Sequence, residues 1–341
     1  MRASVRAISA ALATVAFACF VPAAAQADPP SDRDCRSFPF AVPQGQLAAT
    51  LCLPPGQPTD TVMVLMSGSN YNGQYWDFPY EPETYNFRQA MNEAGYATLV
   101  VDRLGNGASS KPPALSLTAN TTAEALHQIV RSARRGIAGA QPFGKVITVG
   151  HSLTSGTSVM EAAAHRDVDG VLLTGYSHAP SYGEILGVIS SYYPAVNDPR
   201  FAGRGYDPNY LTTRPGSRMH DFFDPADADP AVVDLDEKTK EVFSLSEYPD
   251  GMLSMLPGMS SFIDAPVMIA TGSKDRLSCG IGYAVCASSE TLHAAEAPYF
   301  APEARLRTFV LPGSGHSVNL ARNTVDYQAA VVDWANSITG R

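Results

Sequence analysis

Basic residues are too few and too scattered in this chain to suggest a nucleic-acid-binding protein. Lys and Arg together number 24 against 33 Asp and Glu, so the formal net charge is −9. An acidic chain without a basic cluster repels the phosphates through which nucleic acids attract proteins. Internal repeats and low-complexity segments are missing as well. We therefore expect no nucleic-acid partner.

The apolar run at the N-terminus is too short to span a membrane and has the form of a signal peptide. Its parts are Arg2 and Arg6, the apolar residues 7–20, and the cleavage motif Ala25-Gln26-Ala27. Pro22 argues against a retained membrane anchor, and Ala16 stands where a lipoprotein signal before Cys19 would have leucine. We predict that residues 1–27 are removed and that the protein is secreted without stable membrane insertion. The mature charge is then −9 − 2 = −11.

Cysteines are also few, and the signal peptide removes one of the five. The four that remain are Cys35, Cys52, Cys279 and Cys286. An even number in an exported chain indicates two disulfides. A zinc site is the alternative, but no Cys-x-x-Cys pair or nearby histidine supports it.

Strand-like residues on both sides of a short turn favour one of the three pairings. Residues 37–42 and 46–53 have the pattern of a β-hairpin, which brings Cys35 nearly opposite Cys52. The other two cysteines close a short loop. We therefore predict the disulfides Cys35–Cys52 and Cys279–Cys286.

After this hairpin, apolar β-branched runs alternate with helix-like runs. The predicted strands are 61–66, 97–101, 145–149, 171–174, 267–271 and 306–311, and the predicted helices are 85–93, 122–134, 154–165 and 324–338. Continuous apolar strands separated by helices indicate a mostly parallel sheet covered on both faces. The chain is thus expected to be an α/β protein.

About ninety residues between positions 174 and 267 interrupt this alternation. They are rich in Tyr, Met, Pro and Asp, and a loop of this length requires structure of its own. We predict a small helical insertion. Four aspartates, Asp221, Asp224, Asp227 and Asp229, lack the spacing of an EF-hand, so a solvated acidic surface is the preferred interpretation.

The segment Gly150-His151-Ser152-Leu153-Thr154 connects a predicted strand to a predicted helix. A serine in such a sharp turn projects its Oγ away from the backbone, and the following helix N-terminus favours negative charge. This is the geometry of a nucleophile elbow. We therefore predict that Ser152 is a catalytic nucleophile.

Two later strands each end in a loop with a side chain that could activate this serine. Asp275 follows residues 267–271, and His316 follows residues 306–311 within a glycine-rich loop. The carboxyl ends of parallel strands share one edge of the sheet, so the three groups should meet there. Alone, Asp275 is equally typical of a helix N-cap and His316 of a surface loop. Together, in this chain order, they predict a Ser-His-Asp triad.

Backbone amides are expected to form the oxyanion hole. One is the amide of Leu153, and the other is that of Ser69, which follows Gly68 in the loop after residues 61–66. Tyr71 and Trp76, further along the same loop, could form a wall of the substrate pocket or simply pack beneath it.

These residues resemble the α/β-hydrolase superfamily over nearly all of the mature chain. Residues 102–109 (DRLGNGAS) are also similar to its D-x-x-G-x-G-x-S loop and lack the third glycine of a dinucleotide-binding motif. The resemblance implies the α/β-hydrolase fold, with an eight-stranded, mostly parallel sheet, helices on both faces and no cofactor; no metal is expected. It also implies a cap or lid at residues 180–262, inserted in a core of residues 28–179 and 263–341.

Two residues depart from the superfamily's pattern: Thr154 stands where the elbow usually has glycine, and Ser67 where histidine usually precedes Gly68. A serine nucleophile argues against the epoxide-hydrolase and haloalkane-dehalogenase branches, which use aspartate. We predict a secreted serine hydrolase acting on small-molecule carboxylic esters, lactones among them. The alternatives are a peptidase, which needs cap carboxylates to bind a substrate amine, an acyltransferase, and a non-catalytic ligand-binding protein.

Overall fold

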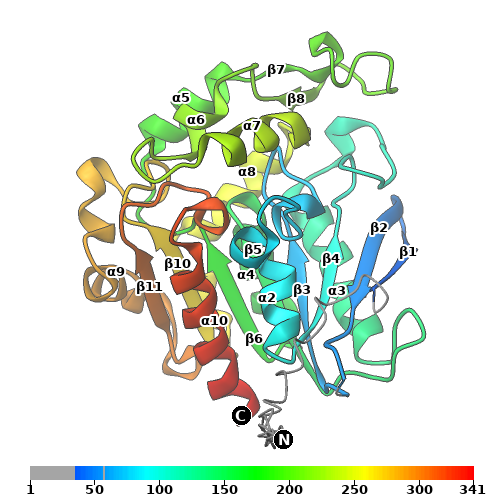
Figure 1. The fold of residues 1–341 in the computed structure, drawn as a ribbon, viewed down its shortest axis with the longest axis vertical. Coiled ribbons are helices and arrows are strands. Elements are labelled where there is room, and N and C mark those ends of the chain that lie inside the picture. The colour runs from blue at the N-terminus through cyan, green and yellow to red at the C-terminus, as the bar shows by residue number, and fades with distance from the viewer. Residues whose placement is uncertain (1–34, 57) are drawn as a thin grey trace, which may run out of the picture. The chain divides into compact units, whose positions relative to one another are not determined.

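An eight-stranded, mostly parallel sheet organises residues 35–56 and 58–341, which are those that the computed structural model describes (Figure 1). The strand order is β1-β2-β4-β3-β5-β6-β10-β11, with β2 antiparallel to both β1 and β4 and all other neighbours parallel. The strands are β1 Cys35–Val42, β2 Gly45–Cys52, β3 Thr61–Met66, β4 Ala97–Val101, β5 Lys145–His151, β6 Gly170–Thr174, β10 Val267–Gly272 and β11 Arg307–Leu311. The predicted signal peptide lies outside the described residues.

The sequence predicts each of these strands with end points that differ by at most two residues. The N-terminal hairpin is confirmed as well, since β1 and β2 pair with Cys35 opposite Cys52. The fold is therefore the α/β-hydrolase architecture that the resemblance implies.

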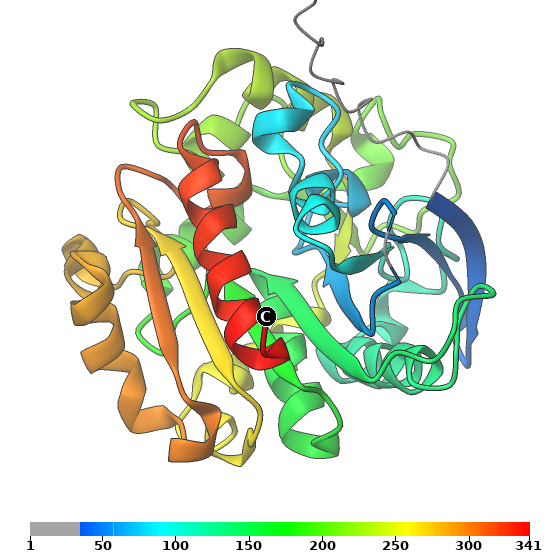
Figure 2. The same cartoon turned by 60° about the horizontal axis from the view of Figure 1, so that its bottom comes forward.

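Alternate side chains of the central strand β3 enter two separate cores. Val62, Val64 and Met66 belong to the core that contains residues of α3, α4 and α9, while Met63 and Leu65 belong to the core that contains residues of α2 and α10. Figure 2 shows α10 lying along its face of the sheet. The helices are α1 Pro82–Tyr85, α2 Phe87–Glu93, α3 Ala119–Ala133, α4 Leu153–His165, α9 Ser289–Glu296 and α10 Thr324–Thr339. Both faces of the sheet are thus covered, which explains why its central strands β3, β4 and β6 are buried throughout.

One helix differs from its prediction, because the run 85–93 is divided between α1 and α2. The break falls at Asn86, which has an extended backbone conformation. Its side-chain oxygen accepts a hydrogen bond from the Gln89 amide at 2.8 Å and so caps α2. An asparagine within a helical pattern can begin a new helix in this way.

The segment between β6 and β10 lies above the carboxyl ends of the parallel strands (Figure 1). Its helices are α5 Tyr182–Ser191, α6 Arg218–Phe222, α7 Pro230–Thr239 and α8 Glu247–Gly251. It also contains a three-stranded antiparallel sheet, which corrects the expectation of a purely helical insertion. Its strands are β7 Tyr193–Pro194, β8 Tyr210–Thr212 and β9 Phe243–Ser244. Strands of two or three residues are too short to show an alternating pattern in sequence.

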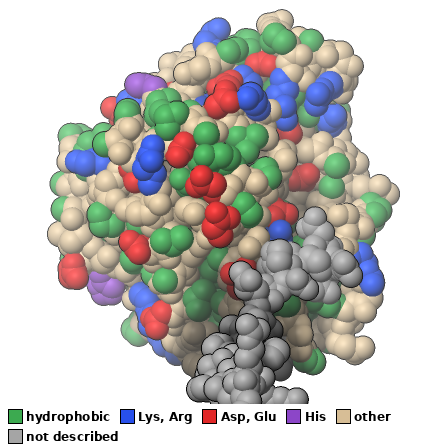
Figure 3. Space-filling view, viewed as in Figure 1, with side chains coloured by type: hydrophobic (Ala, Val, Ile, Leu, Met, Phe, Trp, Pro, Cys, Tyr) green, Lys and Arg blue, Asp and Glu red, His purple; other side chains and the backbone are tan. Residues whose placement is uncertain are grey.

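None of the helices in the described part of the chain is long and apolar enough to cross a membrane. On the face shown in Figure 3, acidic and basic side chains are interspersed with hydrophobic and neutral ones.

Candidate active site

Ser152 occupies the turn between β5 and α4, where the sequence predicts the nucleophile. Its backbone has φ 55° and ψ −119°, a conformation that costs a non-glycine residue roughly 1–3 kcal/mol. A Cβ at Gly150 would overlap the backbone of Thr154 and Ser155, so only glycine fits at that position of the turn. The strained turn presents Ser152 at the N-terminus of α4, whose dipole favours a developing negative charge.

Thr154, which replaces the usual glycine, fits the turn because its hydroxyl bonds to the backbone on both sides of it. The hydroxyl accepts a hydrogen bond from the His151 amide at 3.0 Å and donates one to the Met66 carbonyl at 2.6 Å. The side chain therefore ties the elbow to the neighbouring strand β3.

Asp275 and His316 form a buried pair at the carboxyl ends of β10 and β11. Oδ2 of Asp275 lies 2.9 Å from Nδ1 of His316, and both side chains are almost inaccessible to solvent. Oδ1 of Asp275 accepts hydrogen bonds from the amides of Leu277 at 2.9 Å and Ser278 at 3.0 Å. Burial alone would raise the pKa of Asp275, but His316 and the two amides outweigh it, so the pKa is lowered. The carboxylate thus stays ionised beside the imidazole.

Glycines let these loops approach one another. A Cβ at Gly272 would overlap the carbonyls of Ser314 and Gly315, and one at Gly175 would lie 2.8 Å from Cε1 of His316. Gly175 follows Thr174, whose carbonyl accepts a hydrogen bond from the Ser152 amide at 2.8 Å. The end of β6 and the glycine directly after it therefore contact both Ser152 and the imidazole of His316. Gly175 was not predicted from the sequence, although a glycine directly after a predicted strand was an available signal.

Nε2 of His316 makes no hydrogen bond to any described residue, although it is buried. It lines the same cavity as Ser152. Hydrogen bonds between a nucleophile and its base are often long without substrate and shorten in the complex. The atom predicted to accept the serine proton thus has no partner among the described residues.

His151, next to the nucleophile, is held as a neutral ring away from the base position. It stacks on Tyr75 with ring centroids 4.4 Å apart, and its Nδ1 lies 3.1 Å from Oγ1 of Thr174. Burial, followed by the charges of His316 and Arg218, lowers its pKa well below the usual range. The sequence analysis gave His151 no catalytic role, and these contacts are consistent with that.

The loop that carries Ser69 is held by side chains from two other segments. Arg103 is buried and donates to the carbonyls of Ser67 at 3.1 Å and Gly68 at 3.2 Å, and it forms an ion pair with Glu247 of α8. A Cβ at Gly68 would lie 2.9 Å from Cβ of Ser152, so this loop passes directly beside the predicted nucleophile. The Ser69 hydroxyl lies 3.1 Å from the hydroxyl of Tyr248. The predicted oxyanion loop thus has a fixed backbone.

A narrow cavity of about 50 Å³ lies over Ser152, between the sheet edge and the segment that follows β6. Most of its wall is apolar, and much of that wall comes from α5, α6, α8 and the turn after α8. The lining residues are Ser69, Ser152, Leu153, Gly156, Gly175, Ile185, Val188, Ile189, Tyr192, Phe222, Tyr248, Gly251, Met252, Met255, Leu277, Ser278 and His316. The sequence analysis noted the aromatic and methionine content of this segment without assigning it to a pocket.

Tyr71 and Trp76 do not line this cavity, which corrects their assignment as pocket residues. Both belong to the buried core on the α2 and α10 side of the sheet. The Tyr71 hydroxyl lies 2.7 Å from Oγ of Ser317, and Trp76 packs against Phe87. The packing interpretation of these aromatics is therefore the one that the structure supports, because both side chains are buried in that core.

The disulfides have the pairing that the sequence predicts. Cys35 is bonded to Cys52, and Cys279 to Cys286. The Cys279 amide also donates to the Asp275 carbonyl at 3.2 Å, so the second bridge adjoins the loop that presents the carboxylate.

A second serine, histidine and acid array was not foreseen from the sequence. Nδ1 of His178 lies 2.6 Å from Oε2 of Glu296, and its Nε2 lies 2.9 Å from Oγ of Ser260. All three side chains are buried, and none lines the cavity over Ser152. His178 also stacks on Tyr299 with ring centroids 4.0 Å apart. We therefore interpret this array as part of the packing of the fold.

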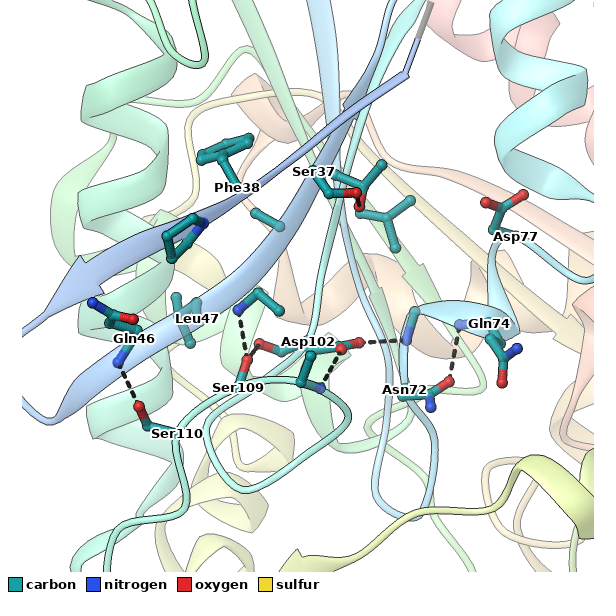
Figure 4. A pocket seen from close by; sticks show the side chains of 17 residues that line it. Ser37, Phe38, Gln46, Leu47, Asn72, Gln74, Asp77, Asp102, Ser109 and Ser110 are labelled. Carbon is teal, nitrogen blue, oxygen red and sulfur yellow. Dashed lines mark hydrogen bonds between the residues drawn. The ribbon is translucent and has the colours of Figure 1, made fainter. Parts of the chain in front are cut away.

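A larger hollow of about 720 Å³ lies beside the hairpin of β1 and β2 and shares no lining residue with the cavity over Ser152 (Figure 4). Asp102 lies in it, and its carboxylate accepts hydrogen bonds from the amides of Gly73 at 2.8 Å and Ala108 at 3.1 Å. A Cβ at Gly107 would overlap that carboxylate. The D-x-x-G-x-G-x-S loop is therefore a structural turn, and none of the described residues that line this hollow is a histidine that could activate a serine.

Comparisons with known proteins agree with this fold. A family model described as the alpha/beta hydrolase family matches residues 63–333. No curated protein sequence matches the chain. Among solved structures, a bacterial membrane phospholipase A described as a virulence factor is similar, with a TM-score of 0.60, 15% identity, and coverage of 90% of this chain and 88% of that one.

Two further structures match with a TM-score of 0.57 and 16% identity. The match to a thermophilic esterase from Thermogutta terrifontis covers 89% of this chain and 99% of the esterase chain. The match to an enol-lactonase from Burkholderia xenovorans covers 88% of this chain and 100% of the lactonase chain. At such identities the structural likeness shows the fold alone. The family-model match extends over most of the sequence, and the chain therefore belongs to the α/β-hydrolase family.

Proposed function

We propose that the protein is a secreted serine hydrolase that cleaves carboxylic esters, lactones included. Ser152 Oγ attacks the carbonyl carbon while Nε2 of His316 accepts its proton, and Asp275 holds the imidazole in the required tautomer. The amides of Leu153 and Ser69 stabilise the oxyanion. The alcohol leaves with the proton from His316, and water then attacks the acyl-enzyme by the same route in reverse.

One observation carries this proposal: a serine in a strained strand-to-helix turn shares an apolar cavity with an imidazole whose Nε2 has no partner among the described residues. The imidazole is bonded on its other side to an ionised carboxylate. These are the parts that a serine hydroxyl needs in order to act as a nucleophile.

The cavity lining favours an ester over a peptide with a free amine. None of the described residues that line it is Asp or Glu, so no carboxylate is present there to bind a substrate ammonium group. The apolar wall instead suits an aliphatic acyl or alcohol group. Aminoacyl-nitroanilides are therefore expected to be poor substrates compared with nitrophenyl esters.

The volume of the cavity points to short acyl groups. Pockets for drug-sized ligands are roughly 300–1,000 Å³, whereas this cavity is about 50 Å³. We expect acetyl and butyryl esters to be cleaved faster than octanoyl esters, because a longer chain would have to displace the side chains of Val188, Met252 and Met255.

We also propose how the chain divides into domains and where the protein is located. Residues 180–262 act as the cap over the active site, with residues 28–179 and 263–341 as the hydrolase core. Residues 1–27 act as a signal peptide. The two disulfides support secretion, since such bonds persist mainly in oxidising compartments.

The second array provides a matched control for identifying the nucleophile. Ser152→Ala should lower kcat for p-nitrophenyl butyrate by roughly 10³-fold or more, while Ser260→Ala should leave it nearly unchanged. A fluorophosphonate followed by peptide mapping should label Ser152 only. Loss of activity in Ser260→Ala, with Ser152→Ala active, would overturn the assignment. Product formation with an added alcohol distinguishes an acyltransferase, and absence of any turnover would favour a ligand-binding protein.

A further inference from the structure

Three side chains with metal-binding atoms meet on the α3 and α4 side of the sheet, apart from the cavity over Ser152. They are His127 on α3, Glu161 on α4 and Asp167 just after α4, and their ligand atoms all lie within 4.8 Å of one another. No metal is expected from the sequence, in which these residues form no motif of short spacing. Only the packing of α3 against α4 brings them together.

Two of the three separations between these atoms are those of ligands around one ion, and the third is within 4.8 Å. Nδ1 of His127 lies 3.5 Å from Oε1 of Glu161 and 3.1 Å from Oδ2 of Asp167. Two ligands about 2.1 Å from a tetrahedral zinc ion are about 3.4 Å apart. An ion could therefore bind with only small side-chain adjustments.

Glu161 is the independent observation that points to a ligand. Its side chain is fully buried, and neither carboxylate oxygen has a hydrogen-bond partner among the described residues. Oδ1 of Asp167 is also buried without such a partner, while Oδ2 of Asp167 lies 3.1 Å from Nδ1 of His127. Buried polar groups are almost always bonded, and a buried carboxylate needs a positive charge. A single cation would satisfy all three side chains.

The competing arrangement is a proton in place of a cation. Burial, followed by the neighbouring Asp167, raises the pKa of Glu161 to about 9, so without an ion this carboxyl group holds a proton. A proton on Glu161 supplies one donor to its carboxyl group, while Nδ1 of His127 lies 3.1 Å from Oδ2 of Asp167. Metal binding and proton retention are thus two distinguishable states of the same cluster.

The chemistry of the ligands selects the class of ion. Carboxylates alone suit magnesium and calcium, while an imidazole favours zinc and related transition metals. The side chains of His127 and Asp167 are 16% and 29% exposed, so an ion can enter from solvent and water can complete its coordination. His165 stacks on His127 with ring centroids 3.5 Å apart and lies 3.1 Å from Glu124, which restricts the orientation of the His127 ring.

We propose that His127, Glu161 and Asp167 form a binding site for a divalent transition-metal ion of the zinc class, which joins α3 to α4. The site is distinct from the esterase site, so its occupancy stabilises the fold and supplies no step of ester cleavage. Metal binding here does not depend on the proposed function.

The test uses the full mature protein without a polyhistidine tag, stripped of metal and titrated with zinc chloride by isothermal calorimetry. We expect one equivalent to bind, and Tm to rise by about 5 °C or more at zinc concentrations roughly a hundredfold above Kd. Magnesium and calcium chloride at the same concentrations should leave Tm unchanged. Glu161→Gln and His127→Gln should each lower zinc affinity at least about tenfold.

His293→Gln is the matched control, because His293 is an exposed histidine of α9 remote in sequence from the cluster. It should bind zinc as the wild type does. Glu161→Gln is expected to fold, because glutamine is close in shape to glutamic acid, and a cooperative thermal melt without zinc checks this. A wild type that binds no zinc, or variants of Glu161 and His127 that bind it with wild-type affinity, would overturn the proposal.

Discussion

Replacing Asp275 by asparagine tests the proposed catalytic array with little change in shape. Oδ1 of Asp275 accepts two backbone amides, those of Leu277 and Ser278, at 2.9 and 3.0 Å. In Asp275→Asn the amide oxygen must remain at that position, because the NH₂ group cannot accept those bonds. The NH₂ group then faces Nδ1 of His316, where Oδ2 lies in the wild type at 2.9 Å.

This arrangement forces the wrong tautomer on the imidazole. Nδ1 of His316 would have to accept a hydrogen bond from the asparagine, so the ring proton moves to Nε2 and that atom can no longer accept the proton of Ser152. A loss of this kind lowers kcat by roughly 10⁴-fold, or about 5 kcal/mol of transition-state stabilisation. Both backbone amides keep their acceptor, so Tm should change little.

The assay compares kcat for p-nitrophenyl butyrate and Tm among three proteins. Asp275→Asn should lose activity and keep its Tm, whereas Asp275→Ala should lose activity and also about 1–3 kcal/mol of stability, because two buried amides lose their acceptor. Asp333→Asn, at a largely exposed carboxylate paired with Arg307, is the control and should match the wild type in both. If folded Asp275→Asn retains kcat within about tenfold of wild type, Asp275 does not orient the base and the reasoning fails.

Two further perturbations follow from the structure. The double variant Cys279→Ser/Cys286→Ser opens a short loop, which should lower the free energy of unfolding by about 2–3 kcal/mol at most. Its kcat should nevertheless fall out of proportion to its Tm, because this loop presents Asp275. An unchanged kcat in the folded variant would show that the bridge only protects the loop. Burial and then Asp224 raise the pKa of half-buried Asp227 to about 6. The folded state therefore loses stability as the pH rises from about 4 to about 6. Asp227→Asn should thus increase the free energy of unfolding by about 1 kcal/mol at about pH 8 and leave it unchanged at about pH 4. Equal Tm shifts in thermal melts at both pH values would contradict this.

Local sequence determined the elements and the chemistry that they carry. The apolar runs of β3, β4 and β10 are long enough to be recognised as buried strands, and each ends close to the predicted residue. Ser152, Asp275 and His316 could be proposed because each directly follows such a strand, and the ends of parallel strands share one edge. The disulfide pairing was accessible for the same reason, since hairpin register and a short loop are local features.

Only the tertiary structure decided which side chains face the cavity and which meet across elements. Tyr71 and Trp76 were indistinguishable from pocket residues in sequence, and the packing of their loop against the core buried them. Val188, Met252 and Tyr248 line the cavity because the segment after β6 folds over the sheet edge. The Ser260–His178–Glu296 array and the His127–Glu161–Asp167 cluster likewise join residues distant in sequence. Sequence periodicity reports the face on which a side chain lies, whereas contacts between elements depend on how those faces pack.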